Sequence, residues 1–187
     1  MLVVGARLVE CIALIRGINV GRAKRIAMAE LRDMFVSLGL ENVRTLMNSG
    51  NVVFTSRRPN KDKLARAIEA GIARSFGISA SVIVITSAEL KRIVEDNPLL
   101  KVVKDPARHL VAFAADSGGL EPARALMKQS WTPDALAIAP TAAYLWCAAG
   151  VIDSKLSQAF ARATKDAVTA RNWTTVLKLH AEACDSP

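Results

Sequence analysis

The sequence lacks the short motifs that mark the common catalytic sites. It contains no GxSxG, no HExxH and no EF-hand loop, and neither His109 nor His180 lies near a recognisable motif. Metal-dependent hydrolysis and a histidine-activated nucleophile are therefore disfavoured. The glycine patterns of P-loops and of dinucleotide-binding loops are absent as well. Because no residue stands out as a general base, the sequence argues against an enzyme and predicts neither a metal nor a cofactor.

Cysteine and aromatic residues are also scarce. The three cysteines, Cys11, Cys147 and Cys184, are far apart and form no CxxC or Cys/His pair, so neither a disulfide framework nor a zinc site is indicated. A reducing cytoplasm suits this pattern. Aromatic residues make up 5% of the chain, and Phe54 is the single one in the predicted central strands of the first half. This disfavours an RNA-recognition sheet, which stacks bases on aromatic side chains.

One long stretch without charge, residues 135–152, approaches the length of a membrane span. Pro140, Thr141 and Gly150 interrupt it, and Asp134 and Asp153 flank it. The alternative is a pair of buried strands joined at Pro140–Thr141, and this interpretation is favoured. We therefore expect that the protein does not associate with a membrane. We also expect it to be located in the cytoplasm.

Positive charge is concentrated in the first half of the chain. The 187 residues carry a formal net charge of +8, and positions 1–86 hold 13 basic against 6 acidic residues. A field of this sign favours anionic partners such as phosphates, nucleic acid or an acidic protein. The alternative is a basic surface that only improves solubility.

The same order of predicted elements, β-α-β-β-α-β-α, occurs twice along the chain. Apolar periodicity and turn residues predict strands at 11–15, 43–46, 51–55, 81–85, 109–114, 136–139, 144–148 and 167–169. Helices are predicted at 28–38, at 64–76, after the capping box Thr86–Glu89, and at 120–129, 154–163 and 172–184.

The βαββαβ order is that of the ferredoxin-like arrangement. We therefore predict the α+β class, with two ferredoxin-like units, each with an added helix, packed into one compact body. The units are expected at residues 1–97 and 108–187, joined by a linker at 98–107. Packing is expected because Cys11–Ile15 and Val82–Ile85 are apolar on both faces, and exposed aliphatic surface of that size invites association.

Two polar turns of the first half form the candidate site. In the ferredoxin-like order the third strand lies beside the first and runs opposite to it, so the end of one neighbours the start of the other. This places the Arg16–Lys24 loop beside the Asn48–Asn51 turn, near the start of the helix at Ala27. Free amides and the dipole at a helix start favour an anion. The candidate binding residues are Arg16, Gly17, Asn19, Gly21, Lys24, Asn48, Ser49, Gly50 and Asn51.

A structural role is the alternative for all of these residues. The glycines then only permit positive φ angles, and the asparagines only bond the backbone of their turns. Three candidates from the second half, Lys155, Arg171 and Asn172, could contribute to the same site. Asn172 stands where the last helix should begin, so its alternative role is an N-cap.

In these segments the chain resembles a widespread, mostly bacterial family of small α/β proteins classed as a domain of unknown function. That family has a first strand running into RGINVGG, an apolar helix, an SGNVVF strand, a SKL segment and an RNWxTVxKL helix. The matching segments here are Arg16–Gly21, Met28–Leu31, Ser49–Phe54, Ser154–Leu156 and Arg171–Leu179. The resemblance implies two related α/β halves and no established reaction, substrate or cofactor.

The chain departs from the family pattern in and near the first loop. Arg22 replaces the second glycine, Ala23 and Lys24 replace residues that are usually Lys and Asn, and Leu46 replaces a common Tyr. The loop is therefore more basic than that of the family.

Taken together, the sequence predicts a cytoplasmic module that binds an anion, either a phosphorylated small molecule or a nucleic-acid backbone, at the two turns. One alternative is an enzyme acting on a phosphorylated or carboxylated metabolite, with Arg16 as the clamp. Another is an interaction module that docks an acidic partner on Arg57, Arg58 and Lys61.

Overall fold

The structure is a computed structural model that describes residues 8–19, 25–57 and 59–184. Contacts divide the chain into two compact units, Met1–Leu90 together with Ala181–Pro187, and Lys91–His180. The division falls within the helix α3 (Ser87–Glu95). The units therefore have other bounds than the segments 1–97 and 108–187 expected from the sequence, because the end of the last helix belongs with the first unit.

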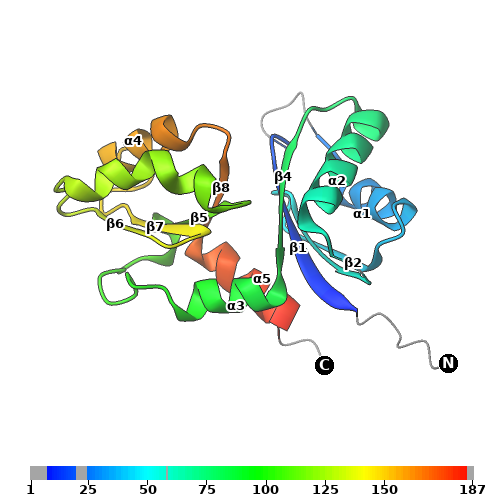
Figure 1. Ribbon diagram of the computed structural model, residues 1–187, viewed down its shortest axis with the longest axis horizontal. Helices are drawn as coiled ribbons and strands as arrows, with labels where there is room; N and C mark the ends of the chain where they lie inside the picture. The colour runs from blue at the N-terminus through cyan, green and yellow to red at the C-terminus, as the bar shows by residue number, and fades with distance from the viewer. Residues whose placement is uncertain (1–7, 20–24, 58, 185–187) are drawn as a thin grey trace. The chain divides into compact units, whose positions relative to one another are not determined.

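The first unit is a four-stranded antiparallel sheet with two helices on one face (Figure 1). Its elements in chain order are β1 (Val9–Arg16), α1 (Met28–Ser37), β2 (Glu41–Leu46), β3 (Asn51–Ser56), α2 (Lys61–Phe76) and β4 (Ser81–Thr86).

Strand β1 lies inside this sheet, between β3 and β4. The strand order is β2-β3-β1-β4, and each neighbouring pair is antiparallel. This confirms the ferredoxin-like arrangement. The side chains from Cys11 to Ile15 are at most 2% exposed, so both faces of β1 are buried. Cys11, Ala13 and Ile15 share a core with Phe35 of α1 and Ile72 of α2.

Local signals in the sequence set the ends of the helices. The Asn60 side chain accepts a hydrogen bond from the amide of Lys63 and caps α2, which ends at Gly77 in the left-handed conformation. At the start of α3, the Glu89 carboxylate accepts from the amide of Thr86, and the Thr86 hydroxyl accepts from the amide of Glu89. This reciprocal pair is the predicted capping box.

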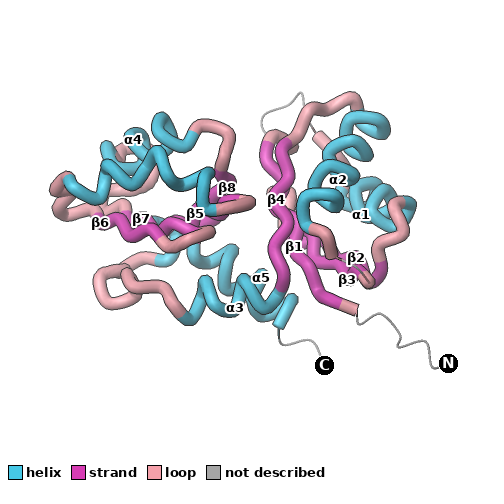
Figure 2. Tube along the Cα trace, in the orientation of Figure 1, coloured by secondary structure: helices cyan, strands magenta, loops and turns pink. Residues whose placement is uncertain are grey.

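The second unit repeats the topology of the first, and Figure 2 distinguishes the strands and helices of both by colour. Its strand order is β6-β7-β5-β8, again antiparallel throughout. The elements are η1 (Pro106–Arg108), β5 (His109–Ala114), η2 (Ser117–Lys128), β6 (Ala135–Ile138), β7 (Ala142–Trp146), α4 (Lys155–Thr164), β8 (Val168–Asn172) and α5 (Trp173–Cys184).

The uncharged stretch 135–152 forms the hairpin of β6 and β7, whose turn contains Pro140 and Thr141. The interpretation as two strands is therefore confirmed. No helix among the described residues has the length and apolar character needed to cross a membrane.

The segment 120–129, expected to form a helix, is helical up to Lys128 but is not a regular α-helix. It is the 3₁₀ helix η2, which begins earlier, at Ser117. Asp116 accepts hydrogen bonds from the amides of Gly118 and Gly119 and so starts the helix at that point. Pro122 lies inside it and has no amide hydrogen to donate. Two glycines and a proline within six residues disfavour the regular α-helix.

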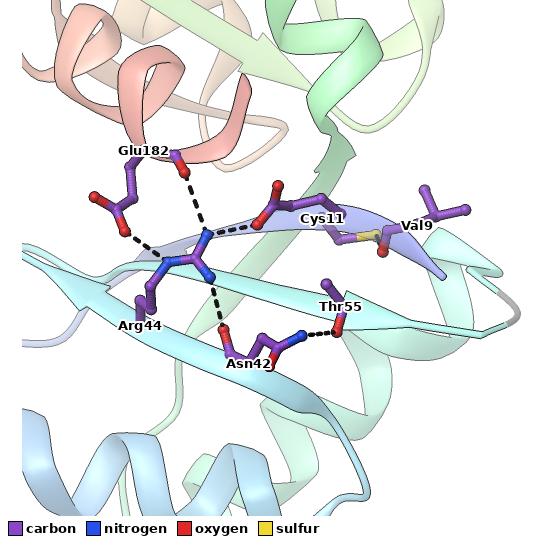
Figure 3. A network of polar contacts seen from close by, with 7 residues as sticks. Val9, Cys11, Asn42, Arg44, Thr55 and Glu182 are labelled. Carbon is purple, nitrogen blue, oxygen red and sulfur yellow. Dashed lines mark hydrogen bonds and ion pairs between the residues drawn. The ribbon is translucent and has the colours of Figure 1, made fainter. Parts of the chain in front are cut away.

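Arg44 on β2 connects the end of α5 to the sheet of the first unit (Figure 3). Its guanidinium pairs with the carboxylate of Glu10 on β1 and, 2.6 Å away, with that of Glu182. It also donates to the backbone carbonyls of Glu182 and Asn42. These contacts explain why Ala181–Pro187 belongs to the first unit rather than the second.

His109 is a fully buried polar residue at the start of β5. Its Nδ1 lies 3.0 Å from the carbonyl oxygen of Leu145, and its Nε2 lies 2.8 Å from Nδ2 of Asn97. A carbonyl only accepts, so Nδ1 carries the proton and Nε2 accepts from the Asn97 amide. The orientation of Asn97 is set in turn by its Oδ1, which accepts from the amide of Leu99. Burial lowers the pKa of His109, and the ring is neutral.

This network makes stability depend on pH. The pKa of His109 is lowered from 6.5, so below that pH the unfolded chain binds a proton that the folded protein does not. The free energy of unfolding is therefore highest above about pH 6.5, where the ring is neutral in both the folded and the unfolded state. It decreases as the pH falls below that value. We expect the free energy of unfolding, measured with urea, to decrease by up to about 1.4 kcal/mol per pH unit below about pH 6.5. His109→Gln should lack this decrease, and parallel profiles for the two proteins would contradict the assignment.

Candidate functional site

The two polar turns meet at one edge of the first sheet, as predicted. The amide of Ile15, near the end of β1, donates to the carbonyl of Gly50 at 2.7 Å. The Asn19 side chain donates to the carbonyl of Asn48 at 3.0 Å. Residues separated by about thirty positions are thus joined by direct hydrogen bonds, because β3 runs antiparallel to β1.

Asn19 holds this edge together. Besides its bond to Asn48, its Nδ2 donates to the carbonyl of Ile26, and its Oδ1 accepts from the amide of Ile26 at 2.8 Å. Asn19 has a φ of 54°, a left-handed conformation that asparagine tolerates better than most residues. One amide side chain therefore closes the β1–α1 loop on itself and ties it to the β2–β3 turn.

A cavity of about 490 Å³ lies where these segments meet α1. Its described lining residues are Asn19, Arg25, Ile26, Ala27, Met28 and Asn48. Ala27 is the N-cap of α1 and has no side chain that could accept from the first amides of the helix. Those amides have no acceptor within the helix, and with the helix dipole they favour a negative charge.

Among the described residues, the cation that lines the cavity is Arg25 rather than Arg16. Arg16 ends β1, opposite Ser81 of β4, and is exposed. It is not among the described residues that line the cavity. Arg25 is separated from Met28, the first residue of α1, by Ile26 and Ala27. Its side chain is exposed and lines the cavity. Gly21 and Lys24, two further candidates, lie outside the described residues.

Four further candidates, Gly17 after β1 and three residues of the β2–β3 turn, shape these turns. Asn51 is fully buried, and its Nδ2 donates to the Ser49 hydroxyl and to the carbonyl of Leu46, which closes the turn. Gly17 and Gly50 have φ angles of 90° and 71°. For these four candidates, Gly17, Ser49, Gly50 and Asn51, the structure shows turn formation.

The three candidates from the second half lie in the second unit. Asn172 Oδ1 accepts from the amide of Thr175, which confirms its role as the cap of α5. The guanidinium of Arg171 donates to the Thr169 hydroxyl and the carbonyl of Ala170, and burial lowers its pKa to about 10. Lys155 begins α4 and lines a separate cavity of about 370 Å³. That they complete the anion site stays a prediction.

The two buried cysteines, Cys11 and Cys147, are not in their reactive thiolate form. Burial raises the pKa of the Cys11 thiol to about 11 and also raises that of Cys147, so both are protonated at neutral pH. Among the described residues, no group of histidine, cysteine and acidic side chains could hold a metal ion. Arg57 pairs with Glu41, and Lys61 with Glu89. Arg58 lies outside the described residues, and an acidic partner at these residues stays a prediction.

The close approach of the two turns gives a direct test with a matched control. A Cβ on Gly50 would lie 2.7 Å from the carbonyl oxygen of Ile15, whereas a Cβ on Gly39 would meet nothing within 4 Å. Both glycines have positive φ angles. We expect Gly50→Ala to lower the free energy of unfolding by about 2–4 kcal/mol and Gly39→Ala by about 1 kcal/mol, measured with urea. Equal losses would mean that the turns are not in contact.

The fold and family of the chain follow from comparison with known proteins. A conserved bacterial protein from Streptococcus pneumoniae has a similar solved structure, with a TM-score of 0.77 and 24% sequence identity over 95% of this chain and 99% of that one. At this identity the likeness concerns the fold alone. No curated protein matches the chain significantly. The sequence profile of the family described as "Protein of unknown function (DUF1697)" matches residues 8–144, well over half of the chain, and the chain therefore belongs to this family.

Proposed function

We propose that the first unit binds a phosphate-bearing ligand in the cavity between the β1–α1 loop and the start of α1. One observation carries the proposal: the start of α1, without a side-chain cap, opens into a cavity with Arg25 in its wall. The cavity holds no acidic side chain among its described lining residues, although Glu30 stands in the first turn of α1.

The lining chemistry suits a phosphate better than a cation or an apolar ligand. Arg25 can offer a planar fork of donors, and the amides at the helix start add directed N–H groups. Asn48 lies beside them in the lining. Asn19 has a structural role in the wall, because its two N–H groups already donate to the carbonyls of Ile26 and Asn48. A site made mainly of donors on a rigid sheet edge is prepared for an anion before the ligand arrives.

The phosphate could belong to a small molecule or to a nucleic-acid backbone, because the cavity offers the same chemistry to both. The net charge of the chain, +8, supports either source by attracting polyanions over a distance. A cytoplasmic location, where phosphorylated metabolites and nucleic acids are both abundant, is part of the proposal.

The role of Arg25 is tested by calorimetric titration with inorganic pyrophosphate at low salt. We expect one molecule bound per chain, and about five- to tenfold weaker binding in Arg25→Gln, since an exposed charge-assisted hydrogen bond is lost. Arg32→Gln is the matched control, because Arg32 lies on α1, pairs with Asp33 and is exposed. Affinities that fall equally in the two variants would reduce the effect to general electrostatics and would contradict the proposed site.

The source of the phosphate is tested by salt dependence. A fluorescein-labelled short single-stranded DNA is titrated with protein at increasing salt, beside the pyrophosphate titration. If the ligand is a nucleic-acid backbone, the DNA should bind with a slope of log K on log salt of about −0.7 for each phosphate neutralised. If the ligand is a small molecule, pyrophosphate should bind and the DNA should not compete. Absence of binding to both at low salt would overturn the proposal.

A further inference from the structure

A second cavity, of about 690 Å³, lies entirely within the second unit. One wall is the loop between α3 and β5, which the sequence analysis treated as a linker (Figure 2). Thr132 and Pro133 also line it, and the strand β7 contributes Trp146. Its volume lies in the usual range of pockets for small organic ligands.

The loop that forms this cavity is anchored to the core of the unit. The amides of Val102 and Val103 both donate to the carbonyl of Leu99. The amide of Leu99 donates to Asn97, which is itself bonded to the buried ring of His109. The loop that lines the cavity is therefore held by hydrogen bonds to a buried polar network.

Two of the cations at this cavity are available to a ligand. Arg108 donates to the carbonyl of Ala148 and pairs with Asp105, so its charge is already used within the wall. Lys101 and Lys104 are exposed at the rim, and neither amine pairs with a carboxylate in the part of the chain that the structure describes. The lining therefore carries an excess of positive charge.

The rest of the lining is apolar and partly open to solvent. Val102 is 45% exposed although it is aliphatic, and Pro133 is exposed as well. Trp146 belongs to the lining and is 6% exposed. Exposed apolar side chains gathered in a concave site are a feature of ligand-binding pockets.

We propose that this cavity binds an amphiphilic organic anion, with a flat apolar body against Val102, Pro133 and Trp146 and an acidic group near Lys101 and Lys104. The neighbouring cavity of about 370 Å³ shares Thr132 and Pro133 but is lined by Asp134 and Asp153, and it disfavours an anion. The proposed site is separate from the phosphate site of the first unit and does not rest on it.

The experiment uses 8-anilinonaphthalene-1-sulfonate, an aromatic sulfonate, as the probe, and the neutral N-phenyl-1-naphthylamine beside it. Binding is followed by probe fluorescence and by the indole N–H signal of Trp146 in a ¹⁵N-tryptophan-labelled protein, assigned with Trp146→Phe. The test variant is Lys101→Gln/Lys104→Gln. The control is Lys128→Gln/Lys178→Gln, which removes two exposed lysines of the same unit.

The sulfonate should bind at one site per chain and shift the Trp146 signal. The double change at 101 and 104 should weaken its binding by about two- to thirtyfold, the combined effect of two exposed charges, and should leave binding of the neutral probe unchanged. The control double variant should bind the sulfonate as the wild type does. An unmoved Trp146 signal, or equal affinities in the test and control variants, would overturn the proposal.

Discussion

The antiparallel pairing of β1 with β3 is the constraint on which the candidate site depends. It brings the backbone of Gly50 so close to Ile15 that no side chain fits between them. Once the two turns are in contact, a single asparagine can span them, and Asn19 bonds to both. The cavity in front of α1 lies at this contact, because Asn19 and Asn48 both line it.

Both candidate cavities combine a rigid frame with a few available charges. In the first unit the frame is the sheet edge and the Asn19 bonds, and the charge is Arg25 with the start of α1. In the second unit the frame is the buried network of Asn97 and His109, and the available charges are those of Lys101 and Lys104. Exposed cations of this kind contribute little to folding stability, and their charge remains available to a ligand.

The topology could be predicted from the sequence because strong local signals agreed with one arrangement. Gly77 and Asn60 mark the ends of α2, and the apolar run of β1 marks a central strand. The contact between the two turns then followed from the strand order. The identity of the cation did not, because the direction of an exposed arginine depends on the path of the loop; the sequence pointed to Arg16, whereas Arg25 lines the cavity. The second cavity was missed because the loop from 98 to 107 carries no periodic pattern, and its anchor, Asn97 on His109, is a contact across twelve residues.

The account depends most on the claim that the start of α1 receives an anion. The most direct measurement is a ¹H–¹⁵N NMR titration of the labelled protein with inorganic phosphate. If the account is right, the amide signals of Met28, Ala29 and Glu30 and the side-chain amide signal of Asn19 shift together and saturate with one affinity. If these signals stay in place while those of scattered surface lysines move, the cavity is not an anion site, and the central claim is contradicted.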